Sequence, residues 1–385
     1  MKIAIFGGSF DPVHAEHVNM ARAAAETLGT DKLIAVPAYI APHKHGAAAS
    51  PEDRLEMARL AFSQVKNCEV SAYECNAGGI SYTYLTLGYF RRRYPDAELY
   101  LLVGSDMLRD FYTWREPETI LSLAELVVCY REGDAPLKGE QLRFQMKFRK
   151  KFRLLPYTGR NISSTRARVL CALGEDVRPY LPESVIDYIE ARRLYRVDGV
   201  KAALKYLKPA RKKHTVRVAL LAAELARKNG CPEGKIVQAA AMHDAAKNLP
   251  PEAPELAGFT PPEGVPAPVL HQFSGAYLAE HTFGVQDPEV LDAIRYHTTG
   301  RPNMGVAEKI VFLADMLENG RDFPHVEKLR SYLGDLNECM YRCLKHQVKY
   351  LRKGKGELCP LTLQAYDYYA RLHAAKKRGE KGSRP

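Results

Sequence analysis

The sequence has no long apolar run and no secretion signal. No apolar stretch approaches the roughly 18 consecutive residues that a membrane-spanning helix requires. The first residues, MKIAIFGGSF, pass from a short apolar run directly to glycines and Asp11, without the apolar core and small-residue cleavage site of a signal peptide. These absences argue against a transmembrane helix and against secretion, so we expect a cytoplasmic protein.

The cysteines lack any ordered spacing. Eight are present, but no CxxC pair and no zinc-finger spacing occurs among them, so we interpret them as reduced structural thiols. Cys339 and Cys343 share a helix face, yet no second pair completes a metal site. The sequence therefore gives no support for a disulfide framework or a cysteine zinc site.

The charge is unbalanced, with a formal net charge of +11. Clustered Lys and Arg side chains bind phosphate, whether in nucleic acids or in small nucleotides. The basic clusters are short and lie at residues 143–153, 211–213 and 376–385. We therefore expect small-molecule nucleotides as partners rather than nucleic acid or a membrane, and we leave a homo-oligomer open.

The two halves of the chain differ in pattern, and 385 residues is a length that usually forms two domains. Residues 1–196 alternate short apolar runs with amphipathic helical segments, which predicts an α/β domain with a Rossmann-like parallel sheet. Residues 197–375 show helical periodicity only and predict an all-α domain. Residues 376–385 are expected to form a basic, flexible tail.

The first group of chemically active residues follows the apolar run KIAIF. Gly7 and Gly8 fall where a parallel strand ends, the edge at which such sheets bind ligands. His14 and His17 then lie on one face of the first turn of a helix. Glycines let a backbone approach phosphate, and a helix N-terminus attracts it. Two imidazoles there can stabilise charge on a transferring phosphoryl group.

A second helix start, NISSTRARVL, carries Ser163, Ser164 and Thr165 before Arg168. By itself this segment fits an ordinary helix cap equally well. Together with the first group, we interpret it as a second anion site.

These motifs resemble those of the bacterial nicotinate mononucleotide adenylyltransferases, members of the HxGH nucleotidyltransferase superfamily, over about residues 1–195. PAYIAPHK, GISYTYLTL, VGSDMLRDFYTWREPETIL and PESVIDYIEARRLY follow in the order that the family uses. The resemblance implies that nicotinate mononucleotide attacks the α-phosphorus of ATP with the help of Mg²⁺, giving nicotinate adenine dinucleotide and pyrophosphate. The implied catalytic residues are His14, His17, Lys44 and Arg168, and the implied substrate-binding residues are Gly7, Gly8, Phe10, Thr83, Gly104, Asp106, Trp114, Ser163 and Ser164.

Thr83 and Trp114 fall where that family recognises the pyridine ring and its carboxylate, so the acid is expected as the substrate rather than the amide. Two positions depart from the family pattern. Glu16 stands where HxGH has glycine and brings a negative side chain near the phosphate site unless it points outward. Ala167 replaces a larger apolar residue in the serine motif.

The helical half contains an ordered series of histidines and aspartates. A histidine–aspartate pair inside an apolar helix is informative, because a buried carboxylate is costly unless it binds a metal or a cation. Imidazoles combined with carboxylates suit iron, manganese or zinc better than magnesium or calcium. The series consists of His214, His243, Asp244, His271, His297 and Asp315.

This series resembles the HD-domain phosphohydrolases that hold two metals. HDxxK, IRYHTTG and LADMLENGRDFP bring residues 198–370 closer to the YqeK-type symmetrical diadenosine tetraphosphate hydrolases, whose products are two ADP. Gln272 and Phe273 replace the family's usual small residue and proline, which puts the substrate pocket in question. The resemblance implies iron, or manganese, with His214, His243, Asp244 and Asp315 on the first metal, His271 and His297 on the second, Asp244 bridging and catalytic, and Lys247 steadying the outgoing phosphate.

The leading hypothesis is therefore a bifunctional enzyme that acts on ATP, nicotinate mononucleotide and diadenosine tetraphosphate. One alternative keeps the transferase and lets the helical half hydrolyse another nucleotide phosphoester. A second alternative makes the helical half a metal-stabilised regulatory or RNA-binding module.

Overall fold

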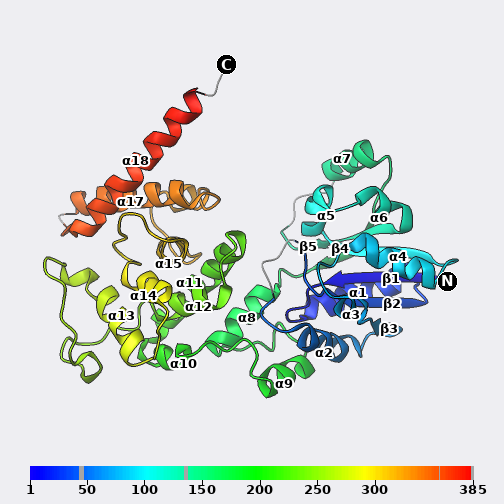
Figure 1. The fold of residues 1–385 in the computed structure, drawn as a ribbon, viewed down its shortest axis with the longest axis horizontal. Helices are drawn as coiled ribbons and strands as arrows, with labels where there is room; N and C mark the ends of the chain where they lie inside the picture. Colours follow the sequence, from blue (N-terminus) through cyan, green and yellow to red (C-terminus); the bar gives the residue numbers. More distant parts are fainter. Residues whose placement is uncertain (43–46, 134–137, 355, 383–385) are drawn as a thin grey trace. The chain divides into compact units, whose positions relative to one another are not determined.

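The computed structural model describes residues 1–42, 47–133, 138–354 and 356–382, and the chain divides into two compact units (Figure 1). The first unit comprises residues 1–168 and 176–195. The second comprises residues 169–175 together with those from 196 onward. Helix α8 (Ser164–Leu173) thus begins in the first unit and ends in the second.

The first unit contains a six-stranded sheet in which all neighbouring strands are parallel, in the order β3-β2-β1-β4-β5-β6. This confirms the predicted α/β fold with a parallel sheet. The strands are β1 (Lys2–Gly8), β2 (Lys32–Pro37), β3 (Cys68–Val70), β4 (Glu98–Gly104), β5 (Glu125–Arg131) and β6 (Arg153–Gly159). The helices are α1 (Ala15–Leu28), α2 (Pro51–Phe62), α3 (Tyr73–Ala77), α4 (Thr83–Arg93), α5 (Ser105–Asp110), α6 (Pro117–Leu123), α7 (Lys138–Phe148), the start of α8, and α9 (Glu183–Ala191).

The strand order reverses between β1 and β4, which are neighbours in the sheet. Both strands read as nearly continuous apolar runs and are buried over most of their length, as expected for parallel strands covered on both faces. Gly7–Gly8 and Gly104 end these two strands. A ligand crevice forms at such a reversal, outside the carboxyl ends of the strands. The fold therefore brings the two glycine-bearing segments to one edge.

Arg54 of α2 fixes the loops that follow β1 and β2. Its side chain is fully buried, at 1% exposure. Nη1 donates to the carbonyl oxygens of Ser9 (2.8 Å) and Ala38 (2.5 Å), and Nη2 donates to that of Tyr39 (2.8 Å). Nε donates to the carbonyl oxygen of Ala49 at 3.3 Å. One guanidinium thus satisfies four loop carbonyls beside the predicted phosphate site.

Replacing Arg54 by methionine should lower the free energy of unfolding of the first unit by about 3 kcal/mol or more, because several buried carbonyls lose their donor. Urea unfolding followed by the fluorescence of Trp114, the one tryptophan of the sequence, measures this directly. Arg59→Met is the matched control, since Arg59 is on the same helix and its side chain is 53% exposed. Equal unfolding midpoints for the two variants would contradict the role given to Arg54.

The second unit is helical, and among its described residues no strand forms, so the all-α prediction is confirmed. Helices α11 and α12 pack closely through alanines that are fully buried, including Ala219, Ala222 and Ala240. Within the described part of the chain, no helix is both long and apolar enough to cross a membrane. The α-helices are α10 (Val200–Ala203), α11 (Pro209–Lys228), α12 (Glu233–Met242), α13 (His271–His281), α14 (Pro288–Arg295), α15 (Val306–Leu317), α16 (Val326–Arg330), α17 (Leu336–Lys353) and α18 (Pro360–Gly382).

Candidate active sites

His14 and His17 cap the start of α1 and stack on each other. Nδ1 of His14 accepts the backbone N–H of His17 (3.3 Å), and Nδ1 of His17 accepts the backbone N–H of His14 (3.1 Å). The ring centroids lie 3.5 Å apart, with an interplanar angle of 13°. An Nδ1 that accepts a hydrogen bond leaves the ring proton on Nε2. The pair therefore presents Nε2–H donors where the helix N-terminus already favours an anion.

The second predicted anion segment contacts the loop that carries the histidines. Ser163 accepts the backbone N–H of Arg166 (3.2 Å) and so acts as the helix cap of α8. Ser164 Oγ donates to the carbonyl oxygen of Pro12 (3.0 Å), and Arg168 Nη1 donates to that of Asp11 (2.5 Å). The start of α8 is thereby held beside the segment that leads into α1.

Glu16 does not point outward into solvent. Its side chain is 8% exposed and accepts hydrogen bonds from Tyr157 Oη (2.7 Å) and from the backbone N–H and Nε of Arg160, both at 3.0 Å. A Cβ at Gly159 would lie 2.9 Å from Glu16 Oε2, so this glycine leaves the room that the carboxylate fills. The carboxylate links α1 to the segment after β6, and its charge is balanced by Arg160. Ala167, the second departure from the family pattern, lies on α8 and is also buried.

Glu16→Ala should lower the free energy of unfolding of the first unit by about 3 kcal/mol at neutral pH, because Tyr157 and Arg160 lose their acceptor. Burial alone would raise the pKa of Glu16, but hydrogen bonds from Tyr157 and Arg160 outweigh it and lower the pKa. A depressed folded-state pKa stabilises the fold above the ordinary value of 4.5, and this stabilisation is lost as the pH falls through the folded-state pKa.

Urea unfolding at a series of pH values, followed by Trp114 fluorescence, measures the difference between wild type and Glu16→Ala. Glu26→Ala removes an exposed carboxylate from the same helix and is the control. A wild-type advantage that stays constant below about pH 4.5 would show that the carboxylate charge is not responsible.

The residues predicted for the adenosine and pyridine sides lie on separate elements of the same edge. Gly104 ends β4 and Asp106 lies in α5, whereas Thr83 begins α4. Trp114 follows Thr113 and packs on Phe111, with ring centroids 5.2 Å apart. The segments of Thr83 and Trp114 adjoin, because the Arg115 guanidinium lies 4.8 Å from the centroid of the Tyr82 ring. Lys44 lies outside the described residues.

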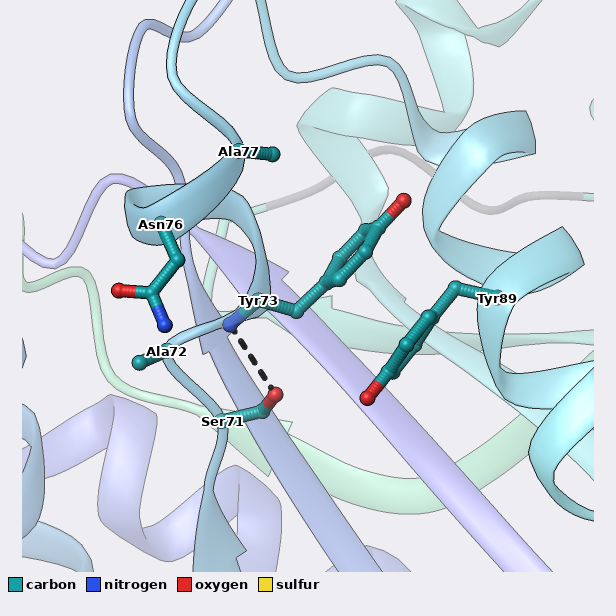
Figure 2. A pocket seen from close by; sticks show the side chains of 6 residues that line it. All are labelled: Ser71, Ala72, Tyr73, Asn76, Ala77 and Tyr89. Carbon is teal, nitrogen blue, oxygen red and sulfur yellow. Dashed lines mark hydrogen bonds between the residues drawn. The ribbon is translucent and has the colours of Figure 1, made fainter.

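A cavity of about 390 Å³ also opens in the first unit, where β3 ends (Figure 2). The rings of Tyr73 and Tyr89 stack in it, with centroids 4.0 Å apart. None of its lining residues is a predicted site residue. The lining consists of Ser71, Ala72, Tyr73, Asn76, Ala77 and Tyr89.

In the second unit, all four predicted histidine ligands place Nδ1 against an oxygen. The acceptors are the carbonyl oxygens of Ala240 for His243, Pro268 for His271 and Ile294 for His297, and Glu318 Oε1 for His214, at distances between 2.7 and 3.1 Å. A carbonyl oxygen can only accept, so Nδ1 of His243, His271 and His297 carries a proton and Nε2 is the nitrogen that faces the centre. Fixing Nδ1 in this way is how proteins orient a histidine that binds a metal.

The Nε2 atoms converge on the two aspartates. Asp315 Oδ1 lies 2.9 Å from His214 Nε2 and 3.8 Å from His243 Nε2. Asp244 Oδ2 lies 3.3 Å from His243 Nε2, whereas Asp244 Oδ1 lies 3.3 Å from His271 Nε2 and 3.7 Å from His297 Nε2. Two sets of ligand atoms are each compact enough for one ion, namely His214, His243 and Asp315, and His243, Asp244 and His297.

The arrangement of the histidine Nε2 atoms suits bound cations better than a network of hydrogen bonds among the side chains. His243 Nε2 is buried and has no hydrogen-bond partner among the described residues. Nε2 of His271 and Nε2 of His297 face each other at 3.2 Å, an approach of two lone pairs that a cation would relieve. Burial contributes most to lowering the pKa of His271 to about 3, so the ring is neutral and available as a ligand.

Both aspartates are ionised in this centre. Burial alone would raise the pKa of Asp244, but His243 and His297 outweigh it and hold the pKa well below the ordinary value. Burial alone would also raise the pKa of Asp315, but the pKa is lowered, and the hydrogen bond with His214 contributes most to the lowering. The buried Asp244, the partly buried Asp315 and four imidazoles therefore provide ligands that a divalent transition metal prefers.

The two departures after His271 are structural. Gln272 is fully buried, and its Oε1 accepts the backbone N–H groups of Thr298 (3.0 Å) and Thr299 (3.1 Å). Its Nε2 donates to Thr299 Oγ1 at 2.8 Å. Gln272 thus fixes the turn that follows His297, and Phe273 is buried beside it. The concern that these residues alter the substrate pocket has no support in these contacts.

Several residues of the centre were not predicted from the sequence. Glu318, 1% exposed, orients His214 and accepts a hydrogen bond from Arg217 Nε (2.6 Å). Glu318 lies within the motif LADMLENGRDFP, but the sequence does not predict that it orients His214. Arg211 and Arg321 contact the two aspartates. The predicted Lys247 places Nζ 3.1 Å from His271 Nε2.

Comparison with known proteins identifies a different family in each half of the chain. The cytidylyltransferase-like family model matches residues 5–170, and the HD domain model matches residues 211–320. The chain is thus a nucleotidyltransferase domain followed by an HD domain, and an HD domain implies a bound divalent metal.

Two relatives span both halves, and both are named as probable nicotinate-nucleotide adenylyltransferase/Ap4A hydrolase. The relative from Mycoplasma genitalium is 32% identical over 83% of this chain and 88% of its own length. The relative from Mycoplasma pneumoniae is 33% identical over 82% and 88%. A solved HD-superfamily hydrolase involved in NAD metabolism, from Clostridium acetobutylicum, is 31% identical over 45% of this chain and 96% of its own, with a TM-score of 0.40. The chain belongs to the nicotinate-nucleotide adenylyltransferase/Ap4A hydrolase family.

Proposed function

We propose that residues 1–196 transfer the adenylyl group of ATP to nicotinate mononucleotide, and that residues 197–375 hydrolyse diadenosine tetraphosphate to two ADP. The relatives that span both halves pair the same two activities in their names. The observation that carries the proposal is the presence of a complete phosphate-directed group in each half. These groups are the stacked His14 and His17 at a helix start, and the histidine–aspartate centre, in which His271 joins the two compact ligand sets through Asp244.

In the transferase, His14 and His17 donate from Nε2 to the α-phosphate of ATP as its negative charge rises. The contacts of Ser164 and Arg168 with Pro12 and Asp11 bring the start of α8 to the same loop. That helix start, together with Lys44 and Arg168, binds the remaining phosphates. The acceptor phosphate attacks the α-phosphorus in line as the bond to pyrophosphate breaks, and Mg²⁺, when bound, would neutralise charge on the departing pyrophosphate.

The adenosine side is formed by the glycine-bearing ends of β1 and β4, with Phe10 and Asp106. Thr83 and Trp114, on adjoining segments, bind the pyridine ring. Production of nicotinate adenine dinucleotide and pyrophosphate from nicotinate mononucleotide and ATP tests this assignment. The acid should be used at least about tenfold better than nicotinamide mononucleotide, as judged by kcat/KM, a difference of about 1.4 kcal/mol in transition-state binding. Equal use of both mononucleotides would reject the pyridine assignment.

In the hydrolase, His214, His243, Asp244 and Asp315 would hold one metal, and His271 and His297 would hold the second. The two oxygens of Asp244 face different histidines, so this carboxylate would serve both metals. Two such metals supply Lewis acidity that activates water and neutralises charge on the phosphate oxygens. The imidazole-rich ligand set favours iron or manganese. Lys247, beside His271, steadies the outgoing phosphate.

Turnover of diadenosine tetraphosphate by the full chain, stripped of metal and then reloaded with iron or manganese, tests the second assignment. We expect activity only after reloading. A metal-loaded chain that leaves this substrate intact would move the assignment to another nucleotide phosphoester or to a regulatory module.

A further inference from the structure

Two arginines bind the same carboxylates that we assign to the metals. Arg211 lies on α11 one turn before His214, and its Nη1 donates to Asp244 Oδ2 at 2.8 Å. Arg321 follows α15, and its Nη2 donates to Asp315 Oδ1 at 2.6 Å. Both arginine side chains are about one third exposed, at 33% and 36%. Each guanidinium therefore reaches from a carboxylate of the centre toward solvent.

Positive charge accumulates around this centre. Lys247 Nζ lies 3.1 Å from His271 Nε2, while Arg211 contacts Asp244 and Arg321 contacts Asp315, so all three cations border the same set of ligands. The charge of Glu318 is already matched by Arg217. With two divalent cations bound, the negative charges of Asp244 and Asp315 are too few to neutralise both the metals and the three side-chain cations. The loaded centre therefore requires an anion with several charges.

Guanidinium groups suit that anion, because their planar fork of N–H donors matches phosphate oxygens. Carboxylate oxygens that coordinate a metal are poorer acceptors for a neighbouring guanidinium. Metal binding and arginine release are thus coupled through Asp244 and Asp315.

We propose that Arg211 and Arg321 form a polyphosphate-binding site, in which both guanidiniums exchange a carboxylate for non-reacting phosphates of the substrate when the metals bind. This inference rests on the proposed hydrolase and names the residues that select a chain of phosphates over a single phosphate. Lys247 contacts the same substrate from the side of His271.

The test compares Arg211→Ala and Arg321→Ala in the full chain, with Lys213→Ala as control, because Lys213 is an exposed cation on the same helix. Mn²⁺ affinity without nucleotide is measured by calorimetry. Binding of a methylene-bridged, non-hydrolysable analogue of diadenosine tetraphosphate, and of inorganic tripolyphosphate, is then measured on the Mn²⁺-loaded chain.

Each arginine variant should keep two equivalents of Mn²⁺ with equal or tighter affinity, yet bind both polyphosphates about 10- to 100-fold more weakly. Lys213→Ala should behave like wild type in both measurements. Loss of Mn²⁺ in the arginine variants would make these residues supports of the metal ligands and overturn the inference, as would unchanged tripolyphosphate binding.

The tripolyphosphate measurement separates this inference from the proposed function. If the wild-type chain does not cleave diadenosine tetraphosphate but binds tripolyphosphate through the arginines, the hydrolase assignment fails and the polyphosphate site stands. If it cleaves diadenosine tetraphosphate and neither variant changes polyphosphate binding, the hydrolase stands and the site fails.

Discussion

Asp244→Ala should abolish hydrolysis of diadenosine tetraphosphate while leaving adenylyl transfer intact. Asp244 faces three histidines of the centre. Its Oδ2 lies near His243, and its Oδ1 lies near His271 and His297. Removing an outer partner of a metal ligand typically costs about 10- to 100-fold, so loss of a bridging ligand should exceed about 1000-fold. The variant should also bind fewer than two equivalents of metal, measured by elemental analysis.

Asp292→Ala is the matched control for Asp244→Ala. Asp292 is a carboxylate of the same unit that pairs with Arg295 and Arg301 and belongs to neither ligand group. It should retain the metals and the hydrolytic rate. Hydrolysis that survives in Asp244→Ala would remove the histidine–aspartate centre from the reaction.

His17→Ala should lower kcat for adenylyl transfer about 100- to 1000-fold, the usual effect of losing one donor to a charge that develops in the transition state. Hydrolysis by the second domain should not change. Because His17 also accepts the backbone N–H of His14, alanine removes part of the helix cap as well as the imidazole.

His17→Asn separates these two effects. The asparagine oxygen can accept the His14 N–H and preserve the cap, but no Nε2–H remains. We expect His17→Asn to unfold at nearly the wild-type urea concentration and to be as inactive as His17→Ala. Full activity in His17→Asn would assign His17 a capping role only.

The fold classes were predictable because the relevant signals are local. Apolar runs such as KIAIF alternate with helical segments in the first half, and this alternation requires a parallel sheet covered by helices. The placement of Gly7, Gly8 and Gly104 at one edge also follows, since the glycines end strands that the fold makes neighbours. The six predicted metal ligands are brought together by helices whose periodicity the sequence displays.

Other features depend on contacts between residues far apart in the sequence. Arg54 is an unremarkable residue in an amphipathic helix, and only the folded chain shows that it serves four loop carbonyls. Glu16 departs from the family pattern, but its partners Tyr157 and Arg160 lie more than 140 residues away along the chain. Gln272 likewise acquires its role from a turn 26 residues later.

The most direct test of the account measures both reactions on one purified preparation of the full chain. We predict nicotinate adenine dinucleotide and pyrophosphate in the first assay and ADP as the only nucleotide product from diadenosine tetraphosphate in the second. AMP together with ATP as the products of the second assay, or the absence of either activity from the metal-loaded preparation, would contradict the assignment of two enzymes to one chain.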